Sequence, residues 1–132
     1  MITGQVNSEL EAVIPLSVYG PKAETHEIEA VIDTGFSGHL TLPRTIADAL
    51  QLDRIATGYL TLADDSEVLS DIYAATILWD GQLREVEADV LETETLVGMA
   101  LLNGYDLSVR VAVGGTVVIK PSSPAQAIVS AE

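Results

Sequence analysis

Val31-Ile32-Asp33-Thr34-Gly35-Phe36-Ser37-Gly38 places an ionisable carboxylate directly after an apolar run and before a turn containing two glycines. Residues 25–32 begin with alternating polarity and end apolar, which is typical of a strand whose far end is buried on both faces. A carboxylate at such a strand end is costly unless function or a partner holds it there, although an Asp that caps a turn would be the simple structural explanation. Asp33 is therefore the first candidate functional residue.

Strand patterns flank this segment on both sides and predict an all-β fold, with one or two short helices. Pro15 predicts that the first strand lies at a sheet edge or carries a bulge, because proline cannot donate to a sheet ladder. The expected strands are 9–19, 25–32, Leu40–Leu42, 59–62, 68–78, 83–91, 107–113 and 116–120, and the expected helices are Arg44–Leu50 and Met99–Gly104. Such an arrangement predicts a closed or partly open β-barrel in a single domain over 1–132, with a core of about 9–120 and a tail of 121–132.

Two turns in this arrangement have clear signals. Asp80-Gly81 is a strong two-residue hairpin signal, and the polar segment Ala63-Asp64-Asp65-Ser66-Glu67 forms the tip of a second, projecting hairpin. In the tail, Ile128-Val129 is the only pair that could add a short strand.

Composition restricts the partners. The 132-residue chain has 6 Lys and Arg against 20 Asp and Glu, a net charge of −14. This balance argues against nucleic acid and anionic membranes. The absence of cysteine excludes disulfides and thiolate zinc sites, and the two histidines are too few for a metal cluster, so we expect no metal and no cofactor. No signal-peptide pattern is present at the N-terminus, and we expect a cytoplasmic protein.

The order of motifs resembles the retropepsin-like aspartic proteases (clan AA), in their short microbial single-domain form. The matching features are Asp33-Thr34-Gly35 after an apolar strand, a polar-tipped hairpin, and Leu96-Val97-Gly98 opening the short helix. The resemblance covers about residues 9–120. It implies an aspartic endopeptidase that needs no cofactor.

A chain with one Asp-Thr-Gly builds an aspartic dyad only with a second copy, so the resemblance implies a homodimer with Asp33 from each chain as the catalytic pair. Thr34 and Gly35 would support the catalytic loop. Candidate substrate-binding residues are Phe36, the hairpin tip Ala63, Asp64, Asp65 and Ser66, and the later Val97 and Gly98. The substrate would be a protein or peptide in an extended conformation, bound as an added strand.

Three positions depart from the family pattern. Phe36 stands where a small residue usually follows the glycine, the hairpin tip contains no glycine, and Ala100 replaces a common Asp or Asn. These departures keep a second hypothesis open, which is a non-catalytic homodimeric β-barrel that binds extended peptides as an interaction module.

Other chemistries have less support. The position two residues after Asp33 is Gly35, so the second aspartate of a dehalogenase-type phosphoacceptor is missing, and no glycine-rich phosphate loop or serine-nucleophile motif occurs. His26 and His39 lack metal-ligand spacing and are expected at the surface. Trp79 is expected to close the core or pair across strands. The alternating acids Glu85, Glu87 and Asp89 indicate a solvated strand face and not a calcium loop.

Overall fold

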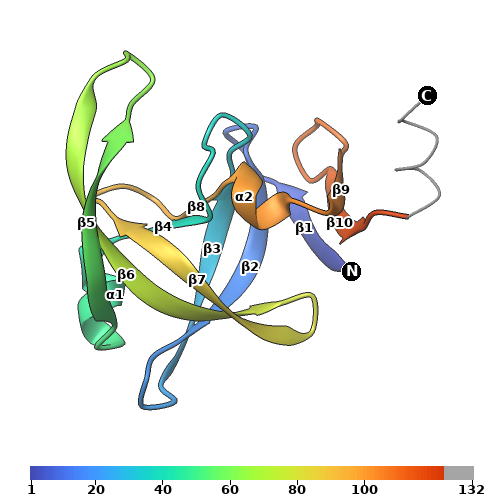
Figure 1. Ribbon diagram of the computed structural model, residues 1–132. Helices are drawn as coiled ribbons and strands as arrows, with labels where there is room; N and C mark the ends of the chain where they lie inside the picture. The colour runs from blue at the N-terminus through green and yellow to red at the C-terminus, as the bar shows by residue number, and fades with distance from the viewer. Residues whose placement is uncertain (124–132) are drawn as a thin grey trace.

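Ten strands and two short helices make up residues 1–123, which are the residues described in the computed structural model (Figure 1). The strands are β1 (Ile2–Val6), β2 (Ala12–Tyr19), β3 (Thr25–Ile32), β4 (Leu40–Leu42), β5 (Asp53–Thr61), β6 (Glu67–Trp79), β7 (Gln82–Val90), β8 (Leu96–Val97), β9 (Tyr105–Val109) and β10 (Thr116–Pro121). The helices are α1 (Arg44–Ala49) and α2 (Met99–Leu102). The predicted all-β class with two short helices is confirmed.

Six of the strands close into a barrel. The sheet runs β6-β7-β4-β8-β3-β2, and β2 pairs back onto β6 through Val18 opposite Ile77. β5 extends the sheet beyond β6, and β1, β10 and β9 extend it beyond β2. The alternative of a partly open barrel is thereby resolved in favour of the closed one.

The short strand β8 is threaded between two strands that precede it by more than fifty residues. It runs parallel to β3, with Val97 opposite Ile32, and antiparallel to β4, with Val97 also opposite Leu40. Val97 and Leu40 are fully buried, so this crossing is held by apolar packing as well as by the ladder. The threading fixes the end of β3, and therefore Asp33, against the segment that opens α2.

The core fills the barrel interior with aliphatic side chains. Alternate residues of β2 (Ile14, Leu16 and Val18) point inward and are at most 2% exposed, and Ile77 of β6 is fully buried. Burying a side chain of this size contributes about 1.5–3 kcal/mol. The predicted helix over Arg44–Leu50 is confirmed as α1, and Leu50 directly after it also packs into this core.

Both predicted turns form. Trp79 pairs with Gln82, so the β6–β7 hairpin has a two-residue loop, and Asp80 and Gly81 have φ of 52° and 81°. Positive φ at both residues is the geometry that Asp-Gly favours in such loops. The other predicted hairpin joins β5 to β6 and projects from the barrel (Figure 1). Its tip and the Asp33 loop lie at the same end of the molecule, the upper end in the figure.

Several predicted strand limits were wrong. The first strand begins at Ala12 instead of Glu9, because Leu10 has φ of 61° and belongs to a turn. The predicted strand 107–113 ends at Val109. The two valines that led to the longer prediction lie beyond the strand and are exposed, Val111 by 72% and Val113 by 67%. Strand β1 was not predicted, because Thr3, Gly4 and Gln5 give it little apolar pattern.

Pro15 and the end of β3 also differ from expectation. β2 is not an edge strand. On one side of β2, however, the pairing with β1 stops at Val13 and the pairing with β6 starts at Val18, so Pro15 lies in a gap between the two pairings. The missing donor is tolerated in this local gap. Val31 and Ile32 are half-buried, not buried on both faces. The tail pair Ile128-Val129 lies outside the described residues.

The remaining aromatic and histidine predictions agree with the structure. Trp79 is 3% exposed and contacts Tyr105 edge to face with ring centroids 5.8 Å apart, so it closes the core as expected. His26 is exposed and His39 half-exposed. Along residues 1–123, no helix is long and apolar enough to cross a membrane.

Asp89 is a half-buried exception on the otherwise solvated face of β7. Its Oδ1 accepts a hydrogen bond from Ser70 Oγ at 3.0 Å. Desolvation raises the pKa of Asp89 above its ordinary value, and the neighbouring Glu87 adds to this effect, while the Ser70 bond opposes it. The folded state therefore disfavours the charged form of Asp89.

Replacing Asp89 by Asn is expected to raise the melting temperature at pH 7 by about 1–3 °C, because the amide oxygen still accepts from Ser70 and the desolvated charge is removed. A carboxyl group whose pKa is raised in the folded state lowers the free energy of unfolding at pH values above that raised pKa. It has no such effect at pH values below its pKa in the unfolded state. The gain should therefore fade as the pH is lowered through the ordinary range of an aspartate. Thermal melts at pH 7 and pH 3 measure it, with Glu85→Gln as the control, because Glu85 is exposed on the same strand and does not shift the pKa of Asp89. An equal gain at both pH values would contradict this origin.

Candidate active site

Asp33 is held by the main chain on both sides. Its N–H donates to the carbonyl oxygen of Val97 at 2.9 Å, which continues the β3–β8 pairing. Its Oδ1 accepts the N–H of Gly35 at 2.9 Å, so the carboxylate also closes the turn that follows. Asp33 is half-exposed, so its carboxylate is held in a fixed position and is still accessible to solvent. Both the turn-capping and the functional explanations of this residue therefore fit the geometry.

Phe36 fills the space beneath the loop. The residue is 9% exposed, and a Cβ placed on Gly98 would lie 2.6 Å from Phe36 Cδ2 and 2.2 Å from the carbonyl oxygen of Gly38. A Cβ on Gly38 would meet the same ring at 2.6 Å. The large residue after Gly35 is thus accommodated by two glycines that contact its ring, and it packs the loop instead of projecting into solvent.

The loop is tied to β8 and α2 by main-chain hydrogen bonds. Gly98 N–H donates to His39 O at 3.0 Å, Met99 N–H donates to Phe36 O at 2.8 Å, and Ala100 N–H donates to Gly38 O at 3.1 Å. The backbone of Ala100 makes this anchor, so the position does not need a polar side chain to hold the loop. Val97 is fully buried and Gly98 is enclosed, so both support the loop from behind.

A cleft of about 700 Å³ separates the Asp33 loop from the β5–β6 hairpin. Its residues come from the loop, the hairpin and the segment before β8. They are Asp33, Gly35, Phe36, Ser37, Thr41, Tyr59, Leu60, Thr61, Leu62, Ala63, Asp65, Leu91, Thr93 and Leu96. The volume lies within the usual range of ligand sites. The structure therefore brings Asp33, Gly35, Phe36, Ala63 and Asp65 of the predicted site together around one cleft.

The hairpin tip forms a tight turn without glycine. Asp64 Oδ1 accepts the N–H of Ser66 at 3.0 Å and its hydroxyl at 2.5 Å, and these bonds lower the pKa of Asp64. Leu62 N–H donates to Ser66 O at 2.8 Å, and Asp65 takes a φ of 67°. Asp64 and Ser66 thus build the turn and do not line the cleft, whereas Ala63 and Asp65 do.

Thr34 lies on a different surface from the cleft. It is exposed and lines a separate hollow of about 540 Å³ together with α2 and the start of β9. The other residues of this hollow are Met99, Ala100, Leu102, Asn103, Gly104, Tyr105 and Leu107. The structure thus separates Thr34 from its neighbour Gly35, which faces the cleft.

Tyr59 and Thr41 are among the cleft residues that were not predicted from the sequence. Tyr59 is 75% exposed on the hairpin and carries the largest exposed aromatic surface near the cleft. Thr41 is 1% exposed, and its hydroxyl donates to Glu94 O at 3.1 Å and accepts Leu96 N–H at 2.9 Å. A polar residue between Leu40 and Leu42 was the signal that could have identified Thr41 as a buried anchor.

Within residues 1–123, no group of three or more histidine or acidic side chains is arranged to hold a metal ion. The cleft itself offers the carboxylates of Asp33 and Asp65, the phenol of Tyr59 and several serine and threonine hydroxyls, besides main-chain donors and acceptors.

Comparisons with solved structures agree with this geometry. The fold is similar to EIAV protease complexed with the inhibitor HBY-793, with a TM-score of 0.56 and 16% identity over 73% of this chain and 88% of that one. It is also similar to a retropepsin-like aspartic protease from Rickettsia conorii, with a TM-score of 0.54 and 17% identity over 92% of this chain and 91% of that one. No family model and no curated protein matches the sequence. The resemblance inferred from the motifs is confirmed at the level of the fold: the chain has the closed-barrel, retropepsin-like fold of aspartic proteases.

Proposed function

We propose that the protein is an aspartic endopeptidase that works as a homodimer, with Asp33 of each copy forming the catalytic pair. The observation that carries the proposal is the position of Asp33, fixed by two main-chain bonds at the floor of a cleft beneath a projecting hairpin. The chain contains one Asp-Thr-Gly, so a second copy must supply the other carboxylate. The retropepsin-like fold supports this assignment.

The two carboxylates would share one proton, because two like charges a few ångströms apart cannot both remain ionised. The ionised member takes a proton from a bound water, which attacks the peptide carbonyl carbon. The protonated member donates a hydrogen bond to the carbonyl oxygen as negative charge develops there. Collapse of the tetrahedral intermediate breaks the C–N bond, and a proton passes to the leaving amine. The reaction consumes one water per peptide bond and needs no metal or cofactor.

The remaining residues have supporting roles in this proposal. Gly35 keeps its N–H on the Asp33 carboxylate, and Phe36, Val97 and Gly98 hold the loop from below. Thr34 faces the hollow beside α2, and we propose that this surface meets the second copy.

The hairpin tip Ala63, Asp64, Asp65 and Ser66 would close over the substrate. An extended peptide would lie between the hairpin and the loop and bind through main-chain groups, with alternate side chains entering pockets. Its partners in this proposal are therefore a second copy and an extended protein or peptide, and not nucleic acid or a membrane.

A specific observation supports the alternative of a peptide-binding interaction module. The hairpin turn is fixed by the bonds between Asp64 and Ser66 and contains no glycine, so its closure over a substrate needs more than a change at the turn itself. A barrel with a stiff tip could bind extended peptides without cutting them.

Incubation with a diverse mixture of unstructured peptides tests the proposal, with mass spectrometry of the products and the solution mass measured at micromolar concentration. The endopeptidase should be a dimer and should release internal fragments. A dimer that retains peptides intact would support the interaction module, and a monomer at micromolar concentration would contradict a self-contained catalytic pair.

A further inference from the structure

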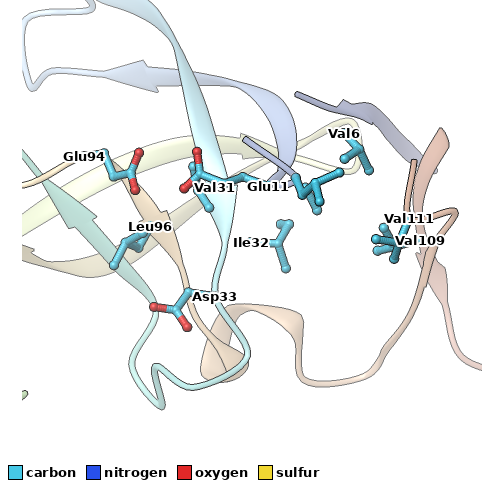
Figure 2. Close-up of a pocket in the computed structure, with 11 residues that line it drawn as sticks. Val6, Glu11, Val31, Ile32, Asp33, Glu94, Leu96, Val109 and Val111 are labelled. Atoms are coloured by element: carbon cyan, nitrogen blue, oxygen red, sulfur yellow. The ribbon is translucent and has the colours of Figure 1, made fainter. Parts of the chain in front are cut away.

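A second cavity adjoins Asp33 on the side of the loop facing the N-terminal segment. It has a volume of about 410 Å³ and is separate from the cleft under the hairpin, although Asp33 and Leu96 line both. Figure 2 shows its side chains. The lining residues are Val6, Leu10, Glu11, Ala12, Val31, Ile32, Asp33, Glu94, Leu96, Val109 and Val111. An occupant of this cavity would therefore lie next to the proposed catalytic carboxylate.

The cavity combines apolar walls with two additional carboxylates. Valine, leucine and isoleucine side chains supply most of its lining, from β1, β3, β8 and β9 and from Leu10 and Val111 outside these strands. Glu11 and Glu94 lie together at the end away from Val109 (Figure 2). Neither Lys nor Arg lines it. A long aliphatic chain ending in a positive charge has this same division into apolar stem and polar head.

Both glutamates are positioned by hydrogen bonds. The Glu11 carboxylate accepts from Asn7 Nδ2 at 3.0 Å, and Glu11 N–H donates to Asn7 Oδ1 at 2.9 Å. The main chain of Glu94 is held by Thr41, whose hydroxyl donates to Glu94 O at 3.1 Å. Thr41 is buried, so the segment carrying Glu94 is anchored to the barrel wall. The Glu11 carboxylate and the main chain at Glu94 are thus positioned before any ligand arrives.

The two glutamates also repel one another. Desolvation raises the pKa of Glu94, and it is raised further by the charge of Glu11, by a side-chain hydrogen bond with Glu11 and by the charge of Glu9. No cationic side chain at the cavity offsets this repulsion. A ligand cation between Glu11 and Glu94 would remove it, so the electrostatics favour a positively charged occupant.

We propose that this cavity is a subsite for a lysine or arginine side chain of the peptide substrate, with Glu11 and Glu94 as the residues that determine the specificity. The inference rests on the proposed peptidase function, since it assigns the occupant to the substrate of Asp33. The aliphatic part of the substrate side chain lies against Val31, Ile32 and Leu96, and its charged end reaches the glutamates.

Paired peptides that differ at one position test the subsite. Each pair carries lysine or norleucine at one site near the scissile bond, which removes the charge while keeping the straight aliphatic chain. We expect kcat/KM to favour lysine by about tenfold at one position in the wild-type protein, as two partly exposed ion pairs of about threefold each would give. The preference should weaken at high salt.

Charge-neutral variants identify the source of that preference. Glu11→Gln and Glu94→Gln should each lower the lysine-to-norleucine ratio to about threefold, and the double variant should bring it to about one. Glu92→Gln is the matched control, because Glu92 is exposed on the same segment and does not line the cavity. It should keep the wild-type ratio.

The outcomes separate the subsite from the proposed function. Cleavage with a ratio near one at every position, or a ratio that survives in the double variant, overturns the subsite and leaves the peptidase standing. If neither peptide is cut, the peptidase is contradicted, and fluorescence anisotropy of the same labelled peptides then tests the cavity alone. Tighter binding of the lysine peptide that disappears in the double variant supports the cavity, and equal binding of both peptides overturns it.

Discussion

Adding a ninefold excess of Asp33→Asn chains to wild-type protein is expected to lower peptide cleavage per wild-type chain about tenfold. If chains assort at random, about one in ten partners of a wild-type chain is then also wild-type, and a mixed dimer has one carboxylate instead of two. The substitution keeps the size of the side chain, and Asn Oδ1 can still accept the N–H of Gly35. The variant should therefore fold and dimerise.

The control is a ninefold excess of Glu85→Gln chains, because Glu85 is exposed on β7 and lines neither the cleft nor the cavity beside Asp33. That mixture should keep full cleavage per chain. Equal activity per wild-type chain in the two mixtures, after time for subunit exchange, would mean that the chains do not share a site.

Replacing Gly98 by Ala is expected to lower the free energy of unfolding by about 3 kcal/mol and to reduce cleavage. The new Cβ would lie 2.2 Å from Gly38 O and 2.8 Å from Phe36 O, and both are main-chain atoms. The loop must then move away from β8. This movement strains the bonds from Gly98 to His39 and from Met99 to Phe36, which hold the Asp33 loop in place.

Gly58→Ala is the matched control. The Cβ added there would meet only Ile72 Cδ1, at 3.1 Å, and the end of a flexible side chain can shift at little cost. Denaturant unfolding of both variants gives the comparison, with the wild-type protein as reference. Equal loss of stability in the two variants would contradict the view that Gly98 is required for close packing of the loop.

Local patterns predicted the centre of the fold because local and tertiary preferences agree there. The apolar strand before Asp33, the Asp80-Gly81 turn and the helix after Pro43 each carry a short-range signal that the barrel also requires. β1 could not be found in this way, because its few apolar residues gain their burial only when β10 and β2 pair on either side.

The site was predicted in part for the same reason. Asp33, Gly35 and Phe36 lie within four consecutive residues, so a single motif identified them. Thr41 and Tyr59 reach the cleft only through the barrel closure.

Phe36 shows most clearly why local sequence patterns could not predict the whole site. The sequence indicates only that Phe36 stands where a small residue usually follows the glycine. In the structure the ring packs against Gly38 and Gly98, which leave room for it because glycine has no Cβ. Phe36 and Gly98 are 62 residues apart in the sequence, so no local pattern indicates that the glycine makes room for the ring.

The most direct test of the catalytic claim is the initial rate of cleavage of one susceptible peptide by wild-type and Asp33→Asn protein, each first shown to be a folded dimer. Removing the carboxylate that activates water should lower kcat by about a thousandfold or more with little change in the melting temperature. A folded Asp33→Asn dimer that cuts the peptide at the wild-type rate would contradict the assignment of Asp33 as the catalytic residue.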